Sequence, residues 1–242
     1  MSQRKTLWKD RVEFLKDISS FIGRNGAFFN QNSNRMSDLF EMSVYSDILR
    51  YYTRKKFEIE VKNINKKNGA FHFKLSPAGI VDNFSYFIVN KKEGNTQLIY
   101  EVHHNTRVQS AHDEYIYFTA DVSVCCLGGV TTVKQSNGKR NSYIENSMLV
   151  TFFEAKNMVP FPEIIFSFNG IVLEVTPKFI MKQILPIKNG NNLCPAIVFA
   201  GKENDHTTRI IQSIKTRYGI NVITGLYATK GKIYSLKNLN EF

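Results

Sequence analysis

The chain has 242 residues, of which 43% are hydrophobic and 22% charged, and its formal net charge is +11. This is the composition of one soluble globular domain, and the excess of lysine and arginine favours a polyanionic partner such as nucleic acid; a basic protein without such a partner is the alternative. No apolar run is long enough to span a membrane or placed to act as a signal peptide, and three cysteines do not make a disulfide framework, so we expect a cytoplasmic protein.

Two amphipathic helices are predicted at the start of the chain. The first covers residues 5–22, so residues 1–34 are a helical extension. We expect a single domain, 1–242, whose core is 37–227. The second covers residues 37–53, with Ser37 as its N-cap. Its apolar side is formed by Leu39, Phe40, Val44, Ile48, Leu49 and Tyr52.

Glu41 is unusual because it falls in the apolar stripe of the second helix, with Val44, Tyr45 and Ile48. A carboxylate turned to a core is costly unless it is paired or bound to a metal. Two interpretations are open at this stage: Glu41 belongs to a functional site, or it is a boundary residue that reaches solvent.

Short strands are predicted next, at residues 57–61, 71–75, 86–89 and 98–102, and turns rich in Lys, Asn and Gly separate them. They form an antiparallel meander. His103 and His104 follow it, but adjacent residues of an extended chain point in opposite directions, so the pair is a poor chelate. We expect them to make ordinary hydrogen bonds in a loop.

Two longer strands follow at residues 115–124 and 148–156, and a polar connection with glycines, residues 128–143, joins them. Asp121 interrupts the apolar run of the first strand, and Glu154 and Lys156 end the second. Since the strand period is two, Glu154 and Lys156 share one face and Ala155 takes the other. If the strands pair, Asp121 joins that face.

The remainder of the chain is typical of a parallel α/β arrangement. Pro162 lies in the first turn of a helix that continues to about residue 175, and a strand (195–200), a helix and a second strand (220–226) follow. Asp205 or Thr207 is the expected cap of that helix, and residues 232–236 form an edge strand.

Three basic residues, Lys202, His206 and Arg209, lie at the start of the helix between the last two core strands. Helix N-termini favour anions, so these side chains are candidate nucleic-acid contacts. A solvated helix start explains them equally well.

Asp121, Glu154 and Lys156 suggest a chemistry for this site. Two nearby carboxylates repel each other, and a divalent cation relieves that repulsion. Hard oxygen ligands suit Mg²⁺. A neighbouring lysine can orient a water molecule or stabilise charge that builds on a phosphate.

The sequence Thr119-Ala120-Asp121, followed by an apolar strand that ends in Glu154-Ala155-Lys156, resembles the PD-(D/E)xK nuclease superfamily. Ala120 stands where that family often has proline, and the long separation of Asp121 from Glu154 implies an inserted hairpin. The resemblance implies a restriction-endonuclease-like core in an α/β fold: a mixed central sheet flanked by helices, with the meander inserted after the first core helix.

By this resemblance, Asp121 and Glu154 hold the metal, the carbonyl of Ala155 and the carboxylate of Glu41 add ligands, and Lys156 positions the attacking water. The expected function is a Mg²⁺-dependent endonuclease acting on DNA, with Mn²⁺ able to substitute and a homodimer expected for double-strand cleavage. The alternatives are a non-catalytic basic module that binds nucleic acid and a structural or assembly protein.

Overall fold

The computed structural model describes residues 36–65, 71–134, 138–180, 191–226 and 231–235. The predicted N-terminal helix at 5–22 lies outside these ranges. Within them the chain forms three α-helices and ten strands of one sheet. None of these helices is both long and apolar enough to cross a membrane.

The three helices have the predicted positions. They are α2 (Met36–Arg54), α3 (Pro162–Val175) and α4 (Asp205–Lys215). The cap of α4 is Asn204 rather than Asp205 or Thr207: its side chain accepts from the Thr207 N–H at 2.9 Å, and the Thr207 hydroxyl accepts in return from the Asn204 N–H at 3.0 Å. This reciprocal capping box places the cap one residue before Asp205 and three before Thr207.

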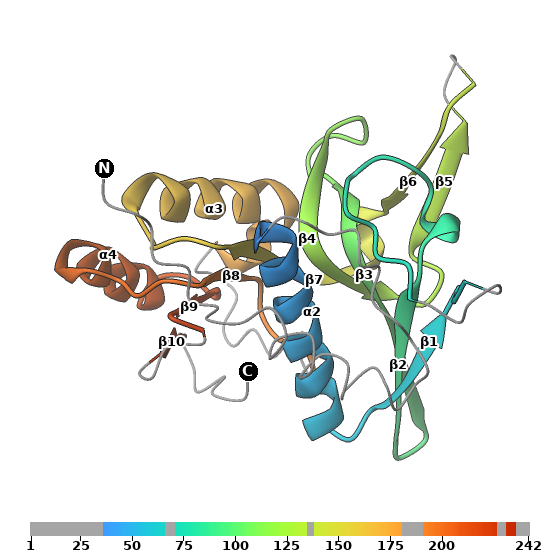
Figure 1. Cartoon of the computed structure of the whole chain (residues 1–242), viewed down its shortest axis with the longest axis horizontal. Coiled ribbons are helices and arrows are strands. Elements are labelled where there is room, and N and C mark those ends of the chain that lie inside the picture. The colour runs from blue at the N-terminus through green and yellow to red at the C-terminus, as the bar shows by residue number, and fades with distance from the viewer. Residues whose placement is uncertain (1–35, 66–70, 135–137, 181–190, 227–230, 236–242) are drawn as a thin grey trace.

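The sheet is mixed and mostly antiparallel, and its strand order is β1-β2-β3-β4-β7-β8-β9-β10 (Figure 1). β8 and β9 run parallel to β7, and all other neighbours along this path are antiparallel. The strands are β1 (Glu58–Lys62), β2 (Tyr86–Glu93), β3 (Thr96–Gln109), β4 (Tyr117–Cys126), β5 (Val130–Lys134), β6 (Arg140–Ile144), β7 (Leu149–Lys156), β8 (Ala196–Phe199), β9 (Asn221–Thr224) and β10 (Lys232–Tyr234).

The connection between β4 and β7 contains a hairpin of its own, β5–β6. β6 also pairs in parallel with the end of β3, at Arg107–Tyr143 and Val108–Ile144. The connection was expected to be a polar turn without strands of its own. The β-branched residues of β5 favour extended backbone and account for the strand that forms there.

Two apolar clusters hold the layers together. One lies between the sheet and α2 and includes Phe40, Tyr45, Phe87, Val122 and Phe153. The other lies between the sheet and the two later helices and includes Phe152, Phe168, Ile197, Ile211 and Val222. The open sheet is therefore covered by α2 on one face and by α3 and α4 on the other (Figure 1).

The predicted strand at residues 71–75 is wrong. Phe71 and Phe73 are buried as its alternation suggested, but the segment is not part of the sheet. Its backbone groups find partners outside a ladder: the His72 N–H donates to Ser85 Oγ and the His72 carbonyl accepts from the Ser85 N–H, both at 2.9 Å, and the Lys74 carbonyl accepts from the His104 ring at 2.8 Å. Burial of alternate residues does not by itself produce a strand when the backbone is satisfied outside a sheet ladder.

Candidate active site

The centre of the candidate site lies at one end of the β4–β7 pair. The antiparallel register of these strands runs from Cys125–Leu149 to Val122–Phe153. Beyond the Val122–Phe153 pair, side chains rather than main-chain bonds connect the two strands. The Ala155 N–H donates to Asp121 Oδ2 at 2.7 Å, and the Asp121 N–H lies 3.4 Å from Glu154 Oε1. The two carboxylates therefore meet where the main chains of β4 and β7 separate.

Lys156 joins both carboxylates. Its Nζ donates to Glu154 Oε2 at 2.6 Å and to Asp121 Oδ2 at 3.2 Å. Phe153 and Ala155 pack in the cluster beneath α2, so the alternation of β7 gives Glu154 and Lys156 the opposite side of the strand. The structure thus brings together the three side chains that the sequence grouped.

Glu41 of α2 interacts electrostatically with Asp121 and Lys156. Burial, followed by the negative charge of Asp121, raises the pKa of Glu41 to about 7. The amide of Asn105 donates to Glu41 Oε2 at 3.1 Å and partly opposes this rise. Glu41 is of intermediate burial, with 17% of its side chain exposed, so it lies at the boundary of the core while its carboxylate contacts Asn105 and His104, and both interpretations stay open.

Two further residues contact Glu41 and were not predicted as part of the site. His104 Nε2 lies 3.6 Å from Glu41 Oε2, and Asn105, with a φ of 47°, turns its side chain toward the same oxygen. Both belong to β3, which continues to Gln109, so His104 does not lie in the expected loop. Asparagine tolerates positive φ better than most residues. An asparagine in a strand is therefore a weak sequence signal for this backbone conformation.

The His104 ring is held in one tautomer. Its Nδ1 donates to the Lys74 carbonyl at 2.8 Å, which leaves the lone pair of Nε2 facing Glu41. Burial lowers the pKa of His104, which favours the neutral ring. The lone pair of Nε2 would repel an ionised Glu41 carboxylate, whereas a protonated Glu41 carboxyl group can lie beside it.

The site carries more negative than positive groups. Burial and then the charge of Asp121 raise the pKa of Glu154. Burial alone would lower the pKa of Lys156, but the charges of Glu154 and Asp121 outweigh it and raise this pKa. Lys156 therefore pairs with two carboxylates, and Glu41 adds further negative charge when it is ionised, an excess that a divalent cation would correct.

We predict that the stability of the metal-free protein falls as pH rises from about 5 to 8. The pKa of Glu41 is about 7 in the folded chain, against a usual value of 4.5. The folded state therefore binds a proton more tightly than the unfolded state, and the stability that this provides is complete below pH 4.5 and is lost as pH rises through 7. At about 1.4 kcal/mol per pKa unit, Glu41 contributes on the order of 2–3 kcal/mol to this fall. Urea unfolding at several pH values, without divalent cations, measures it.

Glu41→Gln should remove that part of the pH dependence, whereas Glu58→Gln, which changes an exposed carboxylate of β1, should leave it unchanged. An identical pH dependence in wild type and Glu41→Gln would show that Glu41 ionises like a solvated carboxylate.

The predicted nucleic-acid contacts lie beyond the neighbouring strand. The chain leaving β8 stays beside β7, since the Ala200 N–H donates to the Lys156 carbonyl and the Gly201 N–H to the Met158 carbonyl, both at 3.0 Å. Lys202, His206 and Arg209 follow, and all three are exposed at the start of α4. They are accessible to a polyanion, and their role stays a prediction.

No protein-family model matches the chain, and comparison with curated proteins and with solved structures found no match. The resemblance carried by Asp121 and Glu154-Ala155-Lys156 therefore stays a prediction from these residues and their geometry.

Proposed function

We propose that the protein is a metal-dependent endonuclease that hydrolyses phosphodiester bonds in DNA, built on a restriction-endonuclease-like core. The observation that carries this proposal is the convergence of Asp121, Glu154 and Lys156 at the diverging ends of β4 and β7, where Asp121 also acts electrostatically on Glu41. Buried carboxylates with raised pKa values cluster at functional sites more often than elsewhere.

The order of the elements also supports the proposal. A helix that carries an acid precedes three antiparallel strands, β3, β4 and β7, and α3 then crosses to the parallel strand β8. This is the arrangement that the resemblance to the PD-(D/E)xK superfamily implies, with the β5–β6 hairpin as the inserted segment.

The carboxylates of Asp121 and Glu154 fit Mg²⁺ or Mn²⁺ because they are hard oxygen ligands with excess negative charge, and the Glu41 carboxylate and Ala155 carbonyl complete the proposed set. When bound, the cation would polarise the phosphate and lower the pKa of a water molecule. The chain's own part is to keep these oxygens close and partly dehydrated. Once the carboxylates are neutralised in this way, the Lys156 ammonium can orient water or stabilise charge on the phosphate.

DNA is the proposed substrate because the chain has a formal net charge of +11 and exposed basic residues follow β8, on the side where Lys156 ends β7. Lys202, His206 and Arg209 would contact the backbone of the nucleic acid. Cleavage of both strands would require two such sites, so we propose a homodimer for that activity.

The test is cleavage of supercoiled plasmid and of linear DNA by the purified chain in Mg²⁺, Mn²⁺ or EDTA. We expect nicked or linear products with either cation and none in EDTA. DNA binding without cleavage in every condition would contradict the proposal.

A non-catalytic module that binds nucleic acid is the second candidate. It is favoured by the ion pairs of Lys156, which satisfy Asp121 and Glu154 without a metal. In this case DNA binding is independent of divalent cations, and replacement of Glu154 by glutamine leaves DNA affinity unchanged.

A further inference from the structure

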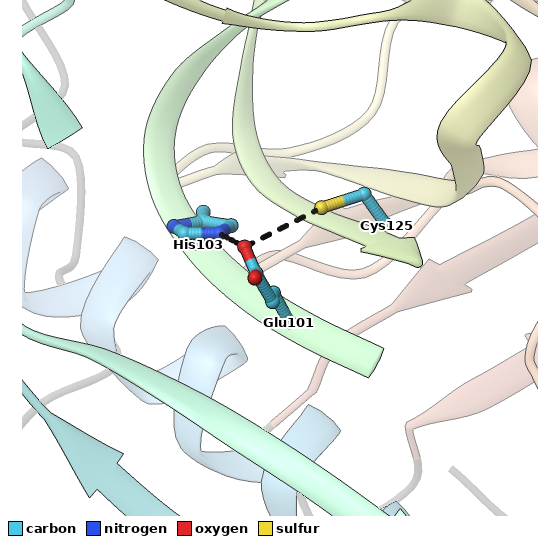
Figure 2. Close-up of side chains that lie close together, drawn as sticks. All are labelled: Glu101, His103 and Cys125. Carbon is cyan, nitrogen blue, oxygen red and sulfur yellow. Dashed lines mark hydrogen bonds and ion pairs between the residues drawn. The ribbon is translucent and has the colours of Figure 1, made fainter. Parts of the chain in front are cut away.

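A second cluster of potential ligands lies within the sheet, where β3 pairs with β4. Figure 2 shows Glu101, His103 and Cys125 pointing toward one another. His103 Nε2 lies 2.8 Å from Glu101 Oε2, and Cys125 Sγ lies 4.0 Å from the same oxygen. The ligand atoms of all three residues lie within 4.8 Å of one another, and all three residues are buried.

The strand register explains how this cluster forms. Glu101 and His103 are two residues apart on β3 and so share one face, and Cys125 is directly opposite Glu101 on β4. The turn after β4 adds a contact, since the Gly128 N–H donates to Glu101 Oε1 at 3.0 Å and Gly128 has a φ of 76° that glycine adopts without strain. One carboxylate oxygen is thereby fixed by the backbone, and the other faces His103 and Cys125.

Ser123 provides an independent observation. It is directly opposite His103 and two residues from Cys125, so it belongs to the same face of β4. Its hydroxyl is fully buried and has no hydrogen-bond partner in the part of the chain that the structure describes. A buried hydroxyl without a partner is uncommon, and this one belongs to the residue that pairs with His103.

The donor set identifies the class of ion. A thiolate, an imidazole nitrogen and a carboxylate oxygen suit zinc, whereas Mg²⁺ prefers oxygen ligands and retains its water. Zinc would balance the two negative charges of the Cys125 thiolate and the Glu101 carboxylate, which a buried site requires. The proposed catalytic cation, held by oxygens alone, would therefore differ from the ion that this cluster selects.

We infer that Glu101, His103 and Cys125 form a structural zinc site, with the hydroxyl of Ser123 as the neighbouring oxygen. The site would join β3 to β4 on the face opposite His104, whose ring packs against Tyr45 of α2 with centroids 5.6 Å apart. The inference is independent of the proposed nuclease activity. Without an ion, Glu101 and His103 form a buried pair with 2.8 Å between Oε2 and Nε2, beside a Cys125 thiol whose pKa burial raises.

Cobalt(II) is the probe, because a cobalt–thiolate bond gives a charge-transfer absorption in the near ultraviolet. The full-length protein, freed of metal by a chelator, is titrated with Co²⁺ and then with Zn²⁺. We expect stoichiometric Co²⁺ binding with a charge-transfer band, and loss of the band when Zn²⁺ displaces the cobalt.

The chain has three cysteines, so removal of the two outside the site tests whether Cys125 is the thiolate that binds the metal. A Cys126→Ser/Cys194→Ala variant retains only Cys125, and we expect it to keep the full band. Cys125→Ser and His103→Asn should lose it, with folding checked by circular dichroism. Glu154→Gln, a change at the other site, should keep it.

Absence of the band in wild type would overturn the inference, as would its loss in folded Cys126→Ser/Cys194→Ala protein. Either result would leave Glu101 and His103 as a buried contact without a metal. Plasmid cleavage is not measured in this experiment, so its outcome is separate from that of the nuclease proposal.

Discussion

Replacement of Lys156 by methionine is expected to reduce metal-dependent DNA cleavage by at least about 100-fold, the usual size of an effect on proton transfer or transition-state charge. Lys156 Nζ is bonded to both Asp121 and Glu154, and it is the ammonium that the proposed reaction places beside the phosphate. Methionine keeps the length and the apolar stem of lysine. The rate of plasmid nicking in Mg²⁺ measures the loss.

The matched control is Lys178→Met, which removes the same charge from an exposed residue after α3. β7 and β8 are parallel, so α3, which connects them, runs back from the end of β7 toward the start of β8. Lys178 follows α3 and therefore lies away from the end of β7, where Lys156 is. We expect Lys178→Met to cleave at the wild-type rate. Lys156→Arg retains the positive charge but not the compact ammonium, and we expect it to lose most of the activity as well.

Cleavage within a few-fold of wild type in folded Lys156→Met protein would contradict the assigned role of this residue. Loss of DNA binding together with cleavage would point instead to a contact with the backbone of the nucleic acid. Fluorescence anisotropy with a labelled duplex separates these results, since an effect on the reaction leaves binding intact.

The central residues of the candidate site could be grouped from the sequence because local periodicity was sufficient. Glu154 and Lys156 are two residues apart in an apolar strand, so their shared side follows from the pleat alone. Glu41 was recognised as unusual because a carboxylate interrupted an apolar helical stripe. Each signal depends on a few neighbouring residues and needs no knowledge of distant contacts.

The polar half of β3 was missed for the opposite reason. His103 and His104 were expected in a loop, yet both are buried in a strand, as is Asn105. Two of the three have partners that are distant in the sequence: His104 bonds to the carbonyl of Lys74 and Asn105 to the carboxylate of Glu41. Local patterns contain no information about such contacts, and the cost of burying these groups is offset only once the tertiary structure has formed.

The segment that contains Lys74 shows how the fold supports the site. Lys74 is 3% exposed, and its Nζ donates to the carbonyls of Ser76 and Asn105, both at 2.7 Å. Burial lowers the pKa of Lys74 to about 8. The chain at residues 71–75 therefore holds both His104 and Asn105, which in turn contact Glu41.

Phe71→Ala is expected to destabilise the protein by about 3–5 kcal/mol, the usual cost of removing a buried aromatic ring. Phe71 is fully buried, and its ring centroid lies 4.5 Å from that of Phe73 and 4.9 Å from that of Phe87. Tyr45 of α2 joins the same group and donates to the Val102 carbonyl of β3 at 2.6 Å. Urea unfolding at a fixed pH measures the difference.

Phe166→Ala is the control, because that ring is 53% exposed on α3 and its removal should change stability by less than about 0.5 kcal/mol. The aromatic group joins the 71–75 segment, α2 and the sheet, so the loss of Phe71 should also loosen the position of Glu41. The pH dependence of stability assigned to Glu41 should therefore weaken in Phe71→Ala. A small stability loss with unchanged pH dependence would mean that the segment packs on the core without supporting the acidic site.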